Sequence, residues 1–338
     1  MAVAWFHFTY TELVKTEWLR ASGEYGWLGV HVFFVISGFV IPYSMYNGGY
    51  RVTEHFGRFF AKRLVRLEPP YLVSIVVVII LWHLSALTPG FRGSPPEYSI
   101  PQLLCHVGYL NTFVGYEWLQ NVYWTLGIEF QYYLFVALIY PLLTVRRPNL
   151  RAIVVATMAG TPLLFETQIL VFYWLGLFIL GMLAFQYHIA LLPGKVFVPA
   201  VAAVAAITAL HHTTTVGGSL DTGLAIPLAG AVTALLIAFV PMPQYPGMRV
   251  FIFLGGISYS LYLLHVPFGG RVINLGLRFS GGLVWEVAVL TMAVAVSVAA
   301  ATAFNWLVEL PAQRLSSRIK YQAPAKTLRV LQPEPVHH

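Results

Sequence analysis

Long apolar runs dominate this chain, and only short polar stretches separate them. A helix that crosses a membrane needs about 20 consecutive apolar residues, whereas a half-buried strand alternates apolar and polar positions. The runs here are continuous, so they predict an all-α fold, a polytopic bundle of membrane helices. We expect about ten segments, near residues 1–13, 26–46, 69–88, 122–145, 151–166, 168–187, 196–211, 223–240, 251–268 and 283–308.

The first segment is too short to cross a bilayer. Thirteen residues of helix rise about 20 Å, against a hydrocarbon core of about 30 Å. It is therefore a buried half-span or the end of a helix that starts upstream of Met1, and we favour the second interpretation. The start of the chain lacks the basic region and cleavage site of a signal peptide. We expect one membrane domain over residues 1–315 and a disordered cytosolic tail over 316–338.

The composition agrees with a membrane protein. Apolar residues make up 58% of the chain and charged residues 10%, whereas a soluble domain carries about 25% charged residues. The net charge of +7 does not indicate a nucleic-acid partner, because no basic stripe belongs to a soluble fold. With the N-terminus placed inside, fifteen Lys and Arg fall inside and five outside. This bias predicts a multi-pass protein of the inner or plasma membrane with both termini in the cytosol.

Polar side chains within the apolar runs are the candidates for chemistry, because lipid penalises unpaired polar groups. His7 stands in AWFHF, where an imidazole could take a proton from a hydroxyl as a general base. The alternative is a structural histidine bonded to a neighbouring helix. His31 and Ser37 could line a polar cavity or serve only as hydrogen-bonding partners between helices. The same stretch contains three glycines that allow helices to approach closely: Gly26, Gly29 and Gly38.

Several charged groups near the ends of the apolar runs are further candidates. Arg63 and Arg66 are three residues apart, hence on one helix face, and suit phosphate recognition or anchoring to lipid headgroups. Glu129 lies inside an otherwise apolar helix and needs a partner, a cavity or a shifted pKa. His265 could be an interface residue and nothing more. No metal site is predicted, because the chain lacks HExxH and CxxC, and Cys105 stands alone.

Five blocks of polar and apolar residues follow one another along the chain: GVHVFFVISGF, FFAKRLVRLEPPY, NVYWTLGIEFQYYLF, GGISYSLYLLH and FNWLVELP. In this order they resemble the acyltransferase-3 superfamily of integral-membrane O-acyltransferases. The resemblance covers about residues 1 to 315. Members of this superfamily modify bacterial surface sugars, lipids and some antibiotics with groups other than amino-acyl groups.

The resemblance implies roles for particular residues. His7 matches the family's catalytic histidine, and Glu129 matches its acidic position. Arg63 and Arg66 match its paired arginines and would bind acyl-CoA, with acetyl-CoA the expected donor. The family's arginine about eleven residues before the histidine would precede Met1, which strengthens the expectation of an upstream start. His31 stands where many members have Asp, so it takes only a supporting role.

The implied reaction moves an acyl group from acyl-CoA to a hydroxyl of a carbohydrate or lipid-linked acceptor, as in polysaccharide O-acetylation. The donor substrate is acyl-CoA, and no permanently bound cofactor is expected. We expect a continuous cavity from the arginines to His7, because acyl-CoA is cytosolic and His7 lies in the outer half of the membrane. Two alternatives stay open: a transporter or flippase subunit, and a catalytically inactive family member.

Overall fold

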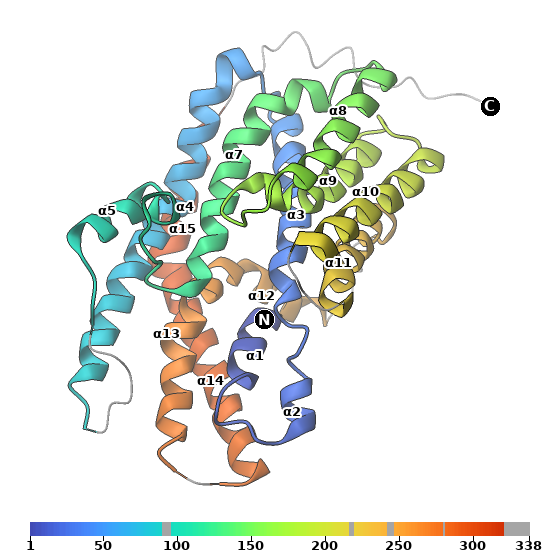
Figure 1. Ribbon diagram of the computed structural model, residues 1–338. Helices are drawn as coiled ribbons and strands as arrows, with labels where there is room; N and C mark the ends of the chain where they lie inside the picture. The colour runs from blue at the N-terminus through green and yellow to red at the C-terminus, as the bar shows by residue number, and fades with distance from the viewer. Residues whose placement is uncertain (90–95, 216–219, 242–246, 280, 321–338) are drawn as a thin grey trace.

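The computed structural model describes residues 1–89, 96–215, 220–241, 247–279 and 281–320 (Figure 1). Every regular element in these ranges is helical, which confirms the all-α fold class. The α-helices are α1 (Ala2–Thr9), α2 (Glu17–Ala21), α3 (Leu28–Asn47), α4 (Val52–Ala86), α5 (Ile100–Val107), α6 (Asn111–Val114), α7 (Trp124–Leu143), α8 (Pro148–Gly160), α9 (Val171–His188), α10 (Gly194–Thr215), α11 (Leu220–Phe239), α12 (Met248–Gly256), α13 (Ser258–Gly276), α14 (Leu283–Phe304) and α15 (Leu310–Ser317).

The predicted count of ten membrane segments is not confirmed. In the described ranges six helical spans are long and apolar enough to cross a membrane, or seven if α12 and α13, bent by 73°, form one span. With 8 and 13 residues, α1 and α8 rise only about 12 and 20 Å. The six are Leu28–Asn47, Val52–Ala86, Asn121–Leu143, Val171–His188, Gly194–Thr214 and Leu283–Ser317.

Exposed apolar side chains form rows along the outside of several helices. On α4 the exposed row is Val76, Ile80 and Leu84, four residues apart and hence on one face. On α11 the corresponding row is Leu224, Leu228, Val232 and Leu236. Apolar rows of this length suit lipid rather than water. The structure therefore agrees with a helix bundle that lies in a bilayer.

The basic stretch before residue 69, which lies outside the predicted apolar segment 69–88, is part of α4. That helix has 35 residues and rises about 52 Å, longer than the hydrocarbon core. Most residues of FFAKRLVRLE are strong helix formers, so the helix starts well before its apolar part. Pro69 and Pro70 lie inside it, as helices in membrane bundles tolerate.

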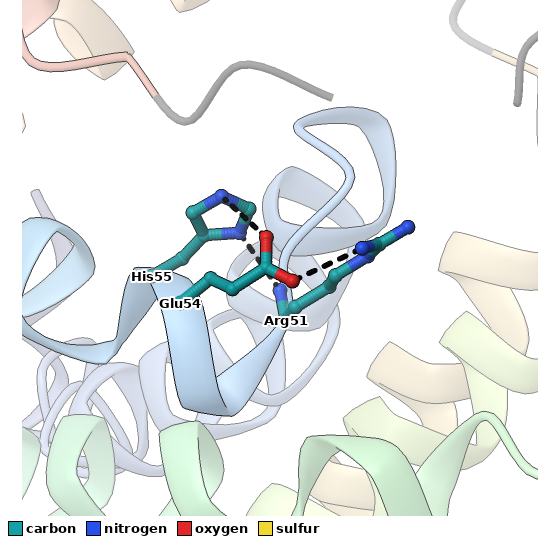
Figure 2. A network of polar contacts seen from close by, with 3 residues as sticks. All are labelled: Arg51, Glu54 and His55. Carbon is teal, nitrogen blue, oxygen red and sulfur yellow. Dashed lines mark hydrogen bonds and ion pairs between the residues drawn. The ribbon is translucent and has the colours of Figure 1, made fainter. Parts of the chain in front are cut away.

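A polar network fixes the start of α4 (Figure 2). The backbone N–H of Arg51 donates to Nδ1 of His55 over 3.0 Å, which satisfies one free donor of the helix end. The Arg51 guanidinium lies 3.0 Å from the Glu54 carboxylate. Glu54 is in the first turn of α4, where the helix dipole stabilises a negative charge. These contacts define where the helix that carries Arg63 and Arg66 begins.

Glycines bring the helices of the core close together, as the sequence predicts. A Cβ on Gly38 of α3 would lie 2.9 Å from the carbonyl carbon of Phe178 on α9. A Cβ on Gly181 of α9 would lie 2.7 Å from the backbone nitrogen of Phe39. The two backbones therefore touch, and α9 is buried along nearly its whole length. A Cβ on Gly29 would lie 2.8 Å from Val3, so α3 also approaches α1 closely.

The C-terminal part of α14 continues into a π-helical turn, Asn305–Glu309, and then into α15. The predicted domain boundary near residue 315 falls within α15. The tail predicted to be disordered lies, from residue 321, outside the described residues.

Candidate active site

The first helix, α1, carries His7 and packs against α13 and α14 at the lower end of the bundle in Figure 1. Ala4 and Phe8 are buried in this contact, with exposed fractions of 3% and 1%. Phe8 lies directly against Gly269 of α13, where any added Cβ would collide with its ring. The position of His7, one residue earlier on the same short helix, therefore depends on this packing.

His265 lies beside His7, with 5.3 Å between the ring centroids. Its Nδ1 atom lies 3.0 Å and 2.8 Å from the carbonyl oxygens of Leu261 and Tyr262. Carbonyl oxygens only accept, so the proton is on Nδ1 and Nε2 carries the lone pair. Nε2 is buried and makes no hydrogen bond to a described residue. The structure thus pairs two histidines that lie far apart in the sequence.

A cavity of about 590 Å³ opens beside His7. It lies between α1, the C-terminal part of α4 and the second half of α13, and Gln120 also contributes to its wall. Its size is within the range of sites that hold small-molecule ligands, about 300–1,000 Å³. The candidate base therefore faces a space large enough for a substrate.

A second, smaller site lies around Arg63 and Glu129. Both residues line a pocket that has room for about one water molecule. The Tyr133 hydroxyl donates to Oε1 of Glu129. The Arg63 guanidinium lies over the rings of Phe59 and Tyr133, 5.5 and 5.4 Å from their centroids. Tyr133 thus contacts both the carboxylate and the cation.

The other residues of this predicted site have different surroundings. Ser37 is buried near Glu129. Arg66 is exposed on α4, whereas Arg63 is 9% exposed, so the two arginines do not share one environment. His31 is buried elsewhere, 5.2 Å from the Trp27 ring and 5.5 Å from the Trp174 ring. The structure brings Arg63, Glu129 and Ser37 together and leaves His31 outside this group.

In the part of the chain that the structure describes, the pocket at Arg63 and the cavity at His7 are separate, rather than the single continuous cavity predicted from the sequence. The two pockets share no lining residue. On α4 their walls end at Glu68 and begin again at Leu81, which is about 20 Å along the helix axis. Buried side chains of Tyr71, Tyr123 and Leu263 pack together in one apolar cluster between these helices. A donor bound at Arg63 therefore reaches His7 only if this layer opens.

Three buried polar groups that are not among the predicted site residues stabilise the scaffold. Glu309 accepts hydrogen bonds from Ser260, Asn305 and Gln313, which ties α13 to the π-helical turn. Glu286 accepts the backbone N–H groups of residues 15 and 16, and so fixes the segment that follows α1. His106 contacts the Tyr71 hydroxyl over 2.7 Å. The only sequence signal for these three residues is a carboxylate or an imidazole within an apolar stretch.

Arg271 and Arg278 are further residues that the sequence analysis used only to count charges. Both line the cavity beside His7. In the described ranges no group of three or more His, Cys, Asp or Glu is placed to hold a metal ion. The cavity therefore combines one imidazole and two guanidinium groups with neutral hydroxyl and amide side chains.

Comparison with known proteins shows the family to which the chain belongs. A family model described as "Acyltransferase domain", that of the acyltransferase-3 family, matches residues 1–302. A protein of Acidianus two-tailed virus named "Putative acetyltransferase ORF330" is 26% identical over 147 residues, 44% of this chain and 39% of that protein. The chain thus matches well under half the length of this relative. No solved structure matches the chain. With the family model extending over most of its length, the chain belongs to the acyltransferase-3 family of membrane acyltransferases.

Proposed function

We propose that this protein transfers an acyl group, with acetyl as the expected case, from acyl-CoA to a hydroxyl group of a carbohydrate or related acceptor. The observation that carries the proposal is His7, a half-buried imidazole on α1 that lines a cavity of about 590 Å³. A neutral imidazole there can accept the hydroxyl proton as the oxygen attacks the thioester carbon. The name of the viral relative supports acetyl as the transferred group.

His265 supports His7 in this proposal. Its Nε2 lone pair is buried and its ring is 5.3 Å from that of His7. When His7 takes the acceptor proton, a neutral ring with a free lone pair beside it stabilises the new imidazolium. A protonated His265 would instead repel that charge. The carbonyl bonds that hold its proton on Nδ1 therefore suit this role.

The donor end of the site lies at Arg63 and Arg66 in our proposal. Arg63 is held between two aromatic rings, and Arg66 is exposed three residues later, where it can meet phosphate groups from the cytosolic side. We expect this side, with both termini, to face the cytosol, because basic residues are in excess there. Glu129 and Tyr133 orient Arg63. The acyl arm must then cross the layer of side chains between the two pockets to reach His7.

One experiment separates the two ends of the site. Purified wild-type protein, His7→Ala and the double variant Arg63→Ala/Arg66→Ala are compared for thiol release from acetyl-CoA with a panel of sugar acceptors. Binding of CoA is measured by calorimetry on the same samples. His7→Ala should lower turnover about 10²- to 10⁴-fold and leave CoA affinity unchanged. The double variant should weaken CoA binding.

The matched control is His188→Ala, since His188 lies at the other end of the bundle, against Phe39 and Tyr43. Near-normal turnover in well-folded His7→Ala protein would exclude His7 as the base. Equal CoA affinity in the double variant would make the two arginines anchors for lipid headgroups. Absence of thiol release from wild-type protein with every acceptor and acyl donor would favour an inactive family member.

A further inference from the structure

The charged side chains that line the cavity beside His7 are all positive. Arg271 and Arg278 both line it, and no Asp or Glu is among its lining residues. Its remaining polar groups are neutral side chains that can donate or accept hydrogen bonds: Thr11, Ser85, Thr88, Gln120 and Asn274. A site that holds two cations and no anion attracts a negatively charged ligand.

Arg271 is held in place by neutral acceptors alone. Its Nε donates to the Ser85 hydroxyl over 2.9 Å and to the carbonyl oxygen of Leu81 over 3.3 Å. Its Nη1 donates to the carbonyl oxygen of Pro267. In the described ranges no carboxylate lies within ion-pair distance of this guanidinium. The side chain is thus fixed in direction, but its charge is not neutralised by the protein.

An arginine within an apolar helix is costly unless its charge has a function or a partner. Arg271 is partly buried in α13, in the described part of a candidate membrane span. Its bonds use Nε and Nη1, and Nη2 makes no hydrogen bond to a described residue. That edge can therefore bind an oxyanion in the cavity. Arg278, two helical turns later, is exposed at the rim.

We propose that this cavity is the acceptor site and that it selects an anionic acceptor, whose carboxylate or phosphate binds Arg271 with Arg278 at the entrance. The proposal rests on the proposed function, since it names the substrate class of the same site. The anion is either the carboxylate of an acidic sugar or the phosphate of a lipid-linked sugar. Both are planar or tetrahedral oxyanions that a guanidinium binds through paired hydrogen bonds.

The acceptor geometry then follows from the positions of the two ends of the cavity. The anion lies at Arg271 on α13, and a hydroxyl of the same molecule lies at His7 on α1. His7 takes the hydroxyl proton, the oxygen forms a bond to the acyl carbon, and the carbon–sulfur bond breaks. The thiolate of CoA leaves and recovers the proton from His7. The arginine contributes orientation and affinity rather than proton transfer.

The test measures binding, so that it does not depend on turnover. Purified protein in detergent is titrated with methyl glucuronide, with methyl glucoside as the neutral match, and with polyprenyl-phosphate glucose. Wild-type protein should bind at least one of the two anionic probes about 10- to 100-fold more tightly than methyl glucoside, as expected for a hydrogen-bonded ion pair. Arg271→Gln should remove that preference, and Arg271→Lys should restore only part of it.

Arg278→Gln is the second variant, because this side chain is exposed and its loss does not disturb the core. Arg278→Gln should weaken binding of the anionic probe by a smaller factor than Arg271→Gln does. The charge-matched control is Arg318→Gln, an exposed arginine at the end of α15 that lines neither cavity. The control should leave binding unchanged.

The outcomes separate the two sources of the anion. Preference for methyl glucuronide assigns the carboxylate, and preference for polyprenyl-phosphate glucose alone assigns the phosphate of a lipid carrier.

Equal binding of the neutral and anionic probes, no binding of any probe, or a preference that survives both Arg271→Gln and Arg278→Gln would overturn the proposal. A His7→Ala variant that binds the anionic probe normally but does not turn over would leave both proposals standing. Normal turnover in His7→Ala would refute the proposed base alone.

Discussion

The contact between Gly269 and Phe8 sets the position of the candidate base, and adding one methyl group there tests this dependence. In Gly269→Ala the new Cβ would lie 2.6 Å from Cε1 of Phe8 and 2.6 Å from Oγ of Ser297. Carbon atoms in normal contact are about 3.5–4.0 Å apart, so α1 must move by roughly 1 Å. Phe8 is 1% exposed, so neighbouring side chains restrict the movement of its ring.

The displacement should reach His7, because it is the neighbour of Phe8 on a helix of 8 residues. A misplacement of about 1 Å at a reacting group can cost about 10²-fold in rate. Overpacking of this kind typically costs about 1–3 kcal/mol of stability. We therefore expect Gly269→Ala to lose about 10²-fold in turnover, with unchanged CoA affinity and a moderately lower unfolding temperature.

The assay follows thiol release from acetyl-CoA, CoA binding and thermal unfolding on the same purified samples. Gly57→Ala is the control, because a Cβ there meets nothing within 4 Å. Activity should return when Gly269→Ala is combined with Phe8→Leu and Ser297→Ala, which remove both colliding groups. Full turnover in the folded Gly269→Ala protein would refute the reasoning, as would a loss that the combined variant does not reverse.

Two further predictions concern the scaffold. Glu309→Ala should lower the free energy of unfolding by about 2 kcal/mol, because it leaves the buried hydrogen-bond donors of Ser260 and Asn305 without their acceptor; unchanged denaturant stability in detergent would contradict this. Burial lowers the pKa of His106, on α5 outside the candidate spans, from 6.5 to about 4. Its neutral form therefore stabilises the fold fully above about pH 6.5, and this contribution is lost as the pH falls toward 4. In His106→Gln the unfolding temperature should fall less than in the wild type between pH 6.5 and pH 4. The same pH dependence in both proteins would contradict this prediction.

The separation of the two pockets matters for the donor path. The walls of the pockets are about 20 Å apart on α4, but Tyr259 and Val266 of α13 line one pocket each and are only about 10 Å apart along that helix. The closed layer between them is narrowest along α13. A small displacement of α13 against α4 would therefore open the shortest route from Arg63 to His7.

The sequence by itself determined the all-α membrane fold and the family. Apolar runs of about 20 residues leave backbone groups no water to bond, so helix is the available structure. The order of the five sequence blocks indicated the family without any knowledge of which residues are in contact. The polar residues within those runs made His7 and Glu129 candidates for function, because a polar side chain in lipid is costly unless it has a partner or a role. The glycines of α3 also predicted close helix packing correctly, since a missing side chain permits backbone contact wherever the partner lies.

The tertiary structure alone decided which polar residues meet. Hydropathy measures the apolar length of a segment but not where its helix begins or ends, so it counted α1 and α8 as spans and missed the long N-terminal part of α4. His7 and His265 are 258 positions apart, and nothing in either local sequence states that their rings lie 5.3 Å apart. In the sequence Arg271 follows the predicted apolar segment 251–268 and has no evident role. In the structure it lines a cavity between α1, α4 and α13. Local sequence fixes helices through backbone hydrogen bonds, whereas a cavity depends on how several distant surfaces pack.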